Sequence, residues 1–173
     1  MQSGHSYFYG CDGFSDWGWG CVYRCVQSFL SLRGHEVPTL PQMMRTLGVA
    51  LRRDEPRSMW IEPVDAKKLI PERTELALFA KHRPSAERLM MRTTWQDADV
   101  VFTDAQSWLK YIDVVSARGP VLLDNGVYSY LLMSKKGKQC ILMDPHRPNA
   151  PMRHESEQWL AESSLWMALS IAG

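Results

Sequence analysis

Cys21 is the residue of this sequence with the clearest potential for chemistry. It directly follows a loop of glycines and aromatic residues, 7–20, and stands where a helix is expected to begin. Unpaired backbone N–H groups and the positive end of the helix dipole stabilise a thiolate at such a position and lower the pKa of the thiol. The position favours a nucleophile, although a structural cysteine is the more frequent occupant of a helix start.

The tripeptide Asp144-Pro145-His146 offers a base for such a thiol. It follows the apolar segment 141–143, and alternate residues of an extended chain point to the same side, so the carboxylate and the imidazole can lie together. A carboxylate that holds one ring nitrogen leaves the other nitrogen free for the thiol. The alternative is an ordinary turn at a strand end. The remaining histidines are interpreted as solvated surface residues: His5, His35, His82 and His154.

Helices are predicted where apolar residues recur at helical spacing. One begins at about Cys21 and stops near Gly34, with its apolar stripe formed by Val22, Cys25, Val26, Phe29 and Leu30. A second is expected over Pro41–Leu47 before Gly48, and a third runs from an N-cap at Thr103 to about Ala117. Residues 152–162 are predicted to be helical, and 52–73 to be loop with short helical pieces.

Strands are predicted in the short apolar runs, mostly in the second half of the chain. The turn residues Asp124-Asn125-Gly126 and the segment 134–138 join three of them as hairpins. The expected strands are 75–80, 121–123, 127–133, 139–143 and 165–171. Helices followed by a mainly antiparallel sheet define an α+β fold, with the N-terminal helices packed on the sheet.

Composition narrows the class of protein. The 173 residues fit a single domain, with 45% hydrophobic and 23% charged residues. A net charge of +1 argues against binding nucleic acid, and no apolar run approaches the length of a membrane span. The first residues lack the features of a secretory signal, so we expect a cytoplasmic monomer that does not insert into membranes. The spacings of the four cysteines, expected to be reduced thiols, match no metal ligand set.

Two motifs together carry a family resemblance. Gly18-Trp19-Gly20-Cys21-Val22-Tyr23-Arg24 and the later Asp144-Pro145-His146 resemble the active-site segments of the ubiquitin-fold modifier 1-specific proteases. Cys11-Asp12-Gly13-Phe14 resembles a segment of the short member of that family. Weaker similarities occur at 38–41 and 60–61. The resemblance therefore runs in order from about residue 7 to 146. It implies a papain-like fold and one catalytic domain, residues 1–173.

The resemblance also implies roles for individual residues. Cys21 would be the nucleophile, His146 the general base and acid, Asp144 the residue that orients His146, and Tyr9 a donor of the oxyanion hole. The backbone N–H of Cys21 is a second natural oxyanion donor. Trp19, with Gly18 and Gly20, would line the cleft for a thin glycine-ended substrate; packed core aromatics are the alternative for Tyr9 and Trp19.

The implied activity is a thiol protease without a cofactor. It would cleave after the C-terminal glycine of the ubiquitin-like modifier, in precursors or in conjugates, and the modifier would be its partner. Two alternatives remain open. The autophagy-related cysteine proteases, which process another modifier, also carry Gly-Trp-Gly-Cys and Asp-Pro-His. A pseudoprotease that binds a modifier without turnover is the second.

Overall fold

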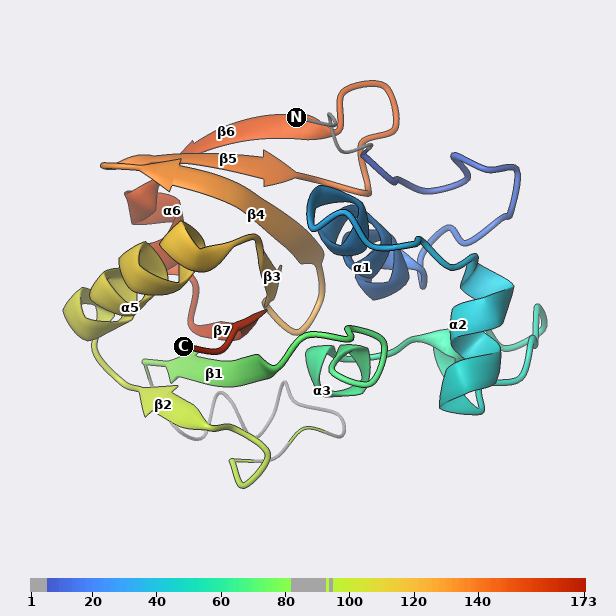
Figure 1. The fold of residues 1–173 in the computed structure, drawn as a ribbon, viewed down its shortest axis with the longest axis horizontal. Coiled ribbons are helices and arrows are strands. Elements are labelled where there is room, and N and C mark those ends of the chain that lie inside the picture. The colour runs from blue at the N-terminus through green and yellow to red at the C-terminus, as the bar shows by residue number, and fades with distance from the viewer. Residues whose placement is uncertain (1–5, 82–92, 94) are drawn as a thin grey trace.

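A seven-stranded sheet forms the centre of the molecule in the computed structural model, which describes residues 6–81, 93 and 95–173 (Figure 1). Its strand order is β2-β1-β7-β3-β4-β5-β6, and every neighbouring pair is antiparallel except β1 and β2. The strands are β1 (Thr74–Ala80), β2 (Val100–Phe102), β3 (Val121–Asp124), β4 (Ser129–Lys136), β5 (Gln139–Met143), β6 (Met152–Ser156) and β7 (Leu165–Ile171). The predicted α+β class is confirmed.

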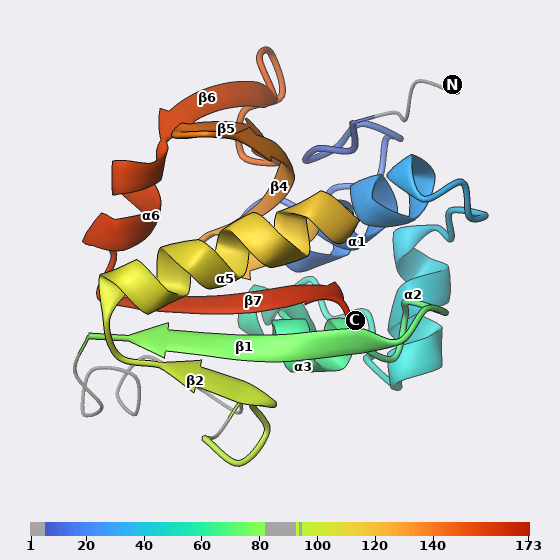
Figure 2. The ribbon, with the colours of Figure 1, turned by 60° about the vertical axis from the view of Figure 1, so that its left-hand side comes forward.

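Helices cover both faces of this sheet, as Figure 2 shows. They are α1 (Cys21–Leu32), α2 (Leu40–Leu47), α3 (Pro63–Ala66), α5 (Ala105–Arg118) and α6 (Glu157–Glu162), with a 3₁₀ turn η1 (Pro56–Met59). The N-terminal helices α1, α2 and α3 pack on one face and α5 and α6 on the other. Because strand side chains alternate between faces, Leu122 and Leu131 belong to the first core, whereas Leu123 and Leu132 belong to the second.

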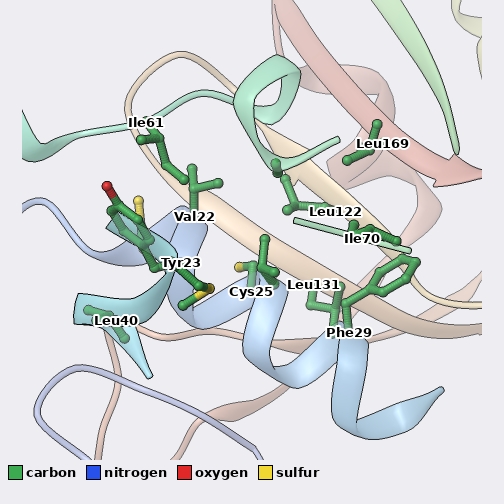
Figure 3. Close-up of a cluster of buried hydrophobic side chains, with 14 of the residues drawn as sticks. Val22, Tyr23, Cys25, Phe29, Leu40, Ile61, Ile70, Leu122, Leu131 and Leu169 are labelled. Carbon is green, nitrogen blue, oxygen red and sulfur yellow. The ribbon is translucent and has the colours of Figure 1, made fainter. Parts of the chain in front are cut away.

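Helix α1 is buried on all sides near its start, not only along the predicted stripe. Every residue from 21 to 30 is buried, including the polar ones. Figure 3 shows Val22, Tyr23, Cys25 and Phe29 of this helix among apolar side chains of the sheet and of neighbouring segments, including Ile61. A helix held this firmly fixes the position of Cys21 at its first turn.

Several predicted elements differ from the observed ones. Residues 152–156 form strand β6 instead of the start of a helix, because they pair with β5 along its whole length; only α6 is helical. Asp104, not Thr103, caps α5, and its carboxylate accepts the Ser107 N–H at 2.8 Å. The short strand β2 was missed, and β4 begins two residues later and ends later than expected, with a bulge between Leu132 and Ser134.

The histidines interpreted as surface residues differ among themselves. His154 is exposed as expected. His35 is half-buried, and its Nε2 lies 2.7 Å from a carboxylate oxygen of Glu72, so its interpretation as a simply solvated residue was wrong. His5 and His82 lie outside the described residues.

Candidate active site

The loop before α1 is fastened to the helix by a buried ion pair. Asp16 accepts Arg24 Nε at 2.9 Å and Arg24 Nη2 at 3.0 Å, and both side chains are fully buried. The same carboxylate accepts the backbone N–H of Gly10 at 2.9 Å. Arg24 also reaches Asp12 and the carbonyl of Phe14. One guanidinium therefore holds several points of the glycine-rich loop against the helix that begins at Cys21.

Gly20 is required by this arrangement. A Cβ atom at this position would lie 2.0 Å from Oδ2 of Asp16, too close for any side chain. The backbone N–H groups of Trp19 and Gly20 both donate to the carbonyl of Asp16, which turns the chain into α1. Gly18 has a φ of 84°, in the left-handed region that glycine favours, and the space where its Cβ would lie is open. At Gly18 and Gly20 the loop before α1 therefore carries no side chain.

The predicted Asp144–His146 pair is present. Oδ1 of Asp144 lies 2.7 Å from Nδ1 of His146 and also accepts the His146 backbone N–H at 3.0 Å. The other carboxylate oxygen accepts Arg153 Nη1 at 3.2 Å, from strand β6. Burial raises the pKa of the Asp144 carboxyl, but the hydrogen bonds from His146 and the Arg153 contact outweigh it and hold that pKa below its usual range. The carboxylate stays ionised and fixes the imidazole through Nδ1, which leaves Nε2 free.

Tyr9 joins the two halves of the site. Its backbone N–H donates to the carbonyl of Pro145 at 3.0 Å, and its ring lies edge-on to the ring of His146 with centroids 5.2 Å apart. Its side chain and that of Cys21 belong to the same buried cluster. Burial, followed by the charge and hydrogen bond of Cys21, raises the pKa of Tyr9, so the phenol remains a donor. The segments around Cys21 and His146, far apart in sequence, therefore meet at Tyr9.

Cys21 does not have the acidic thiol expected from its place at a helix start. It is only 3% exposed, and burial together with the nearby carboxylate of Asp124 raises the pKa of the thiol to about 11. Hydrogen bonds from Ser129 and Tyr9 act in the opposite direction but are outweighed. The expectation of a lowered pKa was therefore wrong for the free protein, because desolvation exceeds the contribution of the helix start.

The aromatic residues around the site fall into buried and exposed groups. Trp19 is 4% exposed and packs edge-on against Phe14 and Tyr23, which is the environment of a core residue. Trp17, in contrast, is 55% exposed, and its ring centroid lies 5.2 Å from that of Tyr9. Tyr128 is half-exposed, with its ring edge-on to His146 at 5.0 Å. Exposed aromatic surface at the site therefore comes from Trp17 and Tyr128.

Sequence reasoning did not identify five residues that shape this site. Arg24 stands in the quoted motif and Asp16 in the loop before it, but nothing in their spacing shows that they pair. Asp124 and Ser129 were interpreted only as hairpin residues; the polar residues flanking the turn were the available signal. Arg153 was assigned to a helix, which hid its position beside Asp144.

Neither a metal-binding cluster nor a membrane-spanning helix is found in the described part of the chain. Across residues 6–81, 93 and 95–173, no three His, Cys, Asp or Glu side chains gather in a way that could hold a metal ion. No helix in this described part is long and apolar enough to cross a membrane.

Comparison with solved structures finds a similar fold in a known protein. The structure of UfSP from C. elegans superposes with a TM-score of 0.64 over 95% of this chain and 32% of that chain, at 13% sequence identity. At this identity the likeness concerns the fold.

A sequence comparison matches part of the chain to a known protein. A segment of 52 residues is 48% identical to mouse Ufm1-specific protease 1, and the chain is homologous to that protein over this segment. The match covers 27% of this chain and only 24% of the mouse protein. No family model matches the chain.

Proposed function

We propose that residues 1–173 form a catalytic domain that hydrolyses the peptide or isopeptide bond after the C-terminal glycine of Ufm1. Ufm1 and its conjugates would be the partners. The observation that carries the proposal is the Asp144–His146 pair, with Oδ1 and Nδ1 2.7 Å apart, against which Tyr9 lies edge-on from the buried cluster that also holds Cys21. Support for the substrate comes from the segment homologous to Ufm1-specific protease 1.

The proposed reaction begins with a proton transfer. Nε2 of His146 accepts the proton of the Cys21 thiol as the sulfur attacks the carbonyl carbon of the glycine. Asp144, already held by Arg153, stabilises the imidazolium that forms. Because the free thiol has a raised pKa, this transfer accompanies substrate binding and does not precede it.

The tetrahedral intermediate places a negative charge on the former carbonyl oxygen. The Tyr9 hydroxyl and the Cys21 backbone N–H, at the first turn of α1, would donate to it. His146 then returns its proton to the departing amine, and the C–N bond breaks to leave a thioester on Cys21. Water, deprotonated by His146, hydrolyses the thioester and restores the thiol. No cofactor takes part in these steps.

The substrate tail is proposed to run along the backbone of Gly18 and Gly20. Gly18 also borders an open depression of about 770 Å³ formed with residues 55–58 of the η1 region. Trp19 would support this loop from the core, while the exposed ring of Trp17 would border the tail. A tail ending in glycine fits a path built from glycine backbone, since neither side carries a bulky side chain.

The experiment is intact-mass analysis of a tail-extended Ufm1 precursor incubated with the protein. Cys21→Ala is the test variant, and Cys140→Ala is the matched control, because Cys140 is buried in the second core, under α5. We expect removal of the tail after the glycine by the wild type and the control, and no cleavage by Cys21→Ala. The precursor of the autophagy modifier is incubated in parallel.

Each outcome separates the candidate functions. Cleavage of the autophagy modifier alone would overturn the Ufm1 assignment. Cleavage of neither, with Ufm1 bound in a titration, would favour the pseudoprotease alternative, which the burial of Cys21 also fits. Cleavage by Cys21→Ala would overturn the assigned nucleophile.

A further inference from the structure

We propose that Val127 and Tyr128 form a subsite for the leaving group of the reaction, and that this subsite takes the aliphatic side chain of a lysine to which the modifier is conjugated. The inference rests on the proposed function, in which His146 returns a proton to the departing amine. It makes hydrolysis of isopeptide bonds to lysine the reaction that this surface serves.

The first argument is the order of the rings around His146. The ring of Tyr9 contacts that of Trp17 and that of His146, with centroids 5.2 Å apart in both pairs. The ring of Tyr128 lies edge-on to His146 with centroids 5.0 Å apart. The four rings therefore form a series of contacts in which His146 lies between Tyr9 and Tyr128.

The two ends of this series come from different parts of the chain. Trp17 and Tyr9 belong to the loop before Cys21, along which the modifier tail is proposed to run. Tyr128 belongs to the turn between β3 and β4. A departing amine must come within hydrogen-bond reach of the acid that protonates it, here His146. The group attached to that amine therefore passes beside the ring of Tyr128.

The second argument is the exposure of this turn. Val127 is 52% exposed and Tyr128 is 50% exposed, and the two residues are adjacent in the chain. Binding sites for small groups are lined mainly by apolar and aromatic side chains beside a few polar ones. Two neighbouring apolar side chains next to a candidate catalytic histidine fit such a site.

The third argument is that the polar backbone groups of the turn are already bonded within it. Oδ1 of Asn125 accepts the N–H of Val127 at 3.0 Å and that of Tyr128 at 2.8 Å, and the Asn125 N–H donates to the carbonyl of Tyr128 at 3.1 Å. Gly126 has a φ of 92°, and its N–H donates to Oδ1 of Asp124. The turn is fixed by these bonds, and it presents apolar side chains to a ligand.

The two possible leaving groups differ in what they need from this surface. A precursor tail continues as peptide backbone, whose N–H and C=O groups require hydrogen-bond partners. A lysine conjugate continues from the scissile nitrogen as a chain of methylene groups, which gain free energy from apolar contact alone. The side chains of Val127 and Tyr128 therefore suit the lysine. When the C–N bond breaks and His146 donates its proton, that lysine leaves as a free amine.

The test compares two substrates that differ only in the leaving group. Ufm1 is joined through its C-terminal glycine to the peptide Gly-Lys-Gly, through the lysine ε-amine in one substrate and through the N-terminal α-amine in the other. Intact-mass analysis gives kcat/KM for each, and the readout is the ratio of the isopeptide value to the linear value. A change that only disturbs His146 lowers both values alike and leaves the ratio unchanged.

The variants remove or keep the apolar contact. We expect the ratio to fall about tenfold for Tyr128→Ser and about threefold for Val127→Ser, because methylene contacts are lost for the isopeptide substrate alone. Tyr128→Phe keeps the ring and should keep the wild-type ratio. Val114→Ser is the matched control, because Val114 is 54% exposed on α5, which packs on the sheet face opposite α1. Cleavage of the linear substrate shows that a variant is folded, and either serine variant at the turn tests the subsite without the other.

Each outcome supports or overturns the subsite. An unchanged ratio in a folded Tyr128→Ser or Val127→Ser protein, or an equal fall in Val114→Ser, would overturn it. Cleavage of the linear substrate alone by the wild type would also overturn it, and would leave Ufm1 as the substrate of the protease. Cleavage of neither substrate would overturn the proposed function together with the subsite that rests on it.

Discussion

Replacing Arg24 by Met tests whether the buried ion pair holds the site together. Arg24 and Asp16 have fully buried side chains, and the guanidinium contacts both carboxylate oxygens, at 2.9 and 3.0 Å. Methionine fills much of the same volume but leaves the Asp16 carboxylate without its cation. Removing one partner of a buried ion pair costs about 3–5 kcal/mol, because an uncompensated charge remains in the interior. That loss is a large part of the ~5–15 kcal/mol that stabilises a domain.

The matched control is Asp12→Asn. Asp12 also contacts Arg24, at 3.0 Å, but its side chain is 37% exposed. A partner in contact with water contributes about 1 kcal/mol or less. Asp12→Asn keeps Arg24 and its buried pair with Asp16, and removes only the charge of the partly exposed partner. Comparing the two variants therefore separates the stability contributed by the buried pair from that contributed by the exposed one.

The assay is equilibrium urea unfolding near neutral pH. We expect a loss of about 3–5 kcal/mol in the free energy of unfolding for Arg24→Met and about 1 kcal/mol or less for Asp12→Asn. Asp16→Asn combined with Arg24→Met should recover part of the loss, because the buried charge is gone. Equal losses for the two single variants, or less than about 1 kcal/mol for Arg24→Met, would refute the reasoning.

Three further predictions concern single groups of the site. Gly20→Ala should lower the free energy of unfolding by about 1–3 kcal/mol in urea, because its Cβ would meet Asp16; an unchanged stability would contradict the close approach. Tyr9→Phe should lower kcat for Ufm1 cleavage by about 10²–10³ with little change in KM, and an equal kcat would remove Tyr9 from the oxyanion site. Asp124 has a folded-state pKa of about 6, above the usual 3.8, so its contribution to stability is complete below the lower value and is lost as pH rises through the upper one. That loss, about 3 kcal/mol, should be missing from the urea-unfolding pH profile of Asp124→Asn; identical profiles would argue against it.

Local signals explain the parts of the fold that the sequence predicted well. The apolar spacing after Cys21 and the glycine at 48 mark α1 and α2, and Gly48 adopts a left-handed conformation with a φ of 71°. The Asp124-Asn125-Gly126 turn marks the β3–β4 hairpin. In each case the residues that determine the conformation are close together in the chain, so their types and spacing are sufficient.

Elements that depend on distant partners were not predictable in the same way. Apart from Met152, residues 152–156 carry charged and polar side chains with little strand character, and they become β6 only because the edge of β5 is available for pairing. Strand β2 likewise exists through its parallel pairing with β1. Neither pairing can be recognised from the residue types of the strand itself. For this reason the sequence could not place Arg153 beside Asp144.

The protonation state of Cys21 also depends on both local and distant residues. A helix start is a local feature and predicts an acidic thiol. Two effects raise the pKa of the Cys21 thiol instead: its burial, and the carboxylate of Asp124 from the β3–β4 hairpin. Both depend on residues distant in sequence, and together they outweigh the effect of the helix start. A thiol that is protonated in the free protein is still compatible with the proposed function. The oxyanion would form when the sulfur attacks the bound carbonyl, where Tyr9 would stabilise it, and His146 would take the thiol proton in the same step.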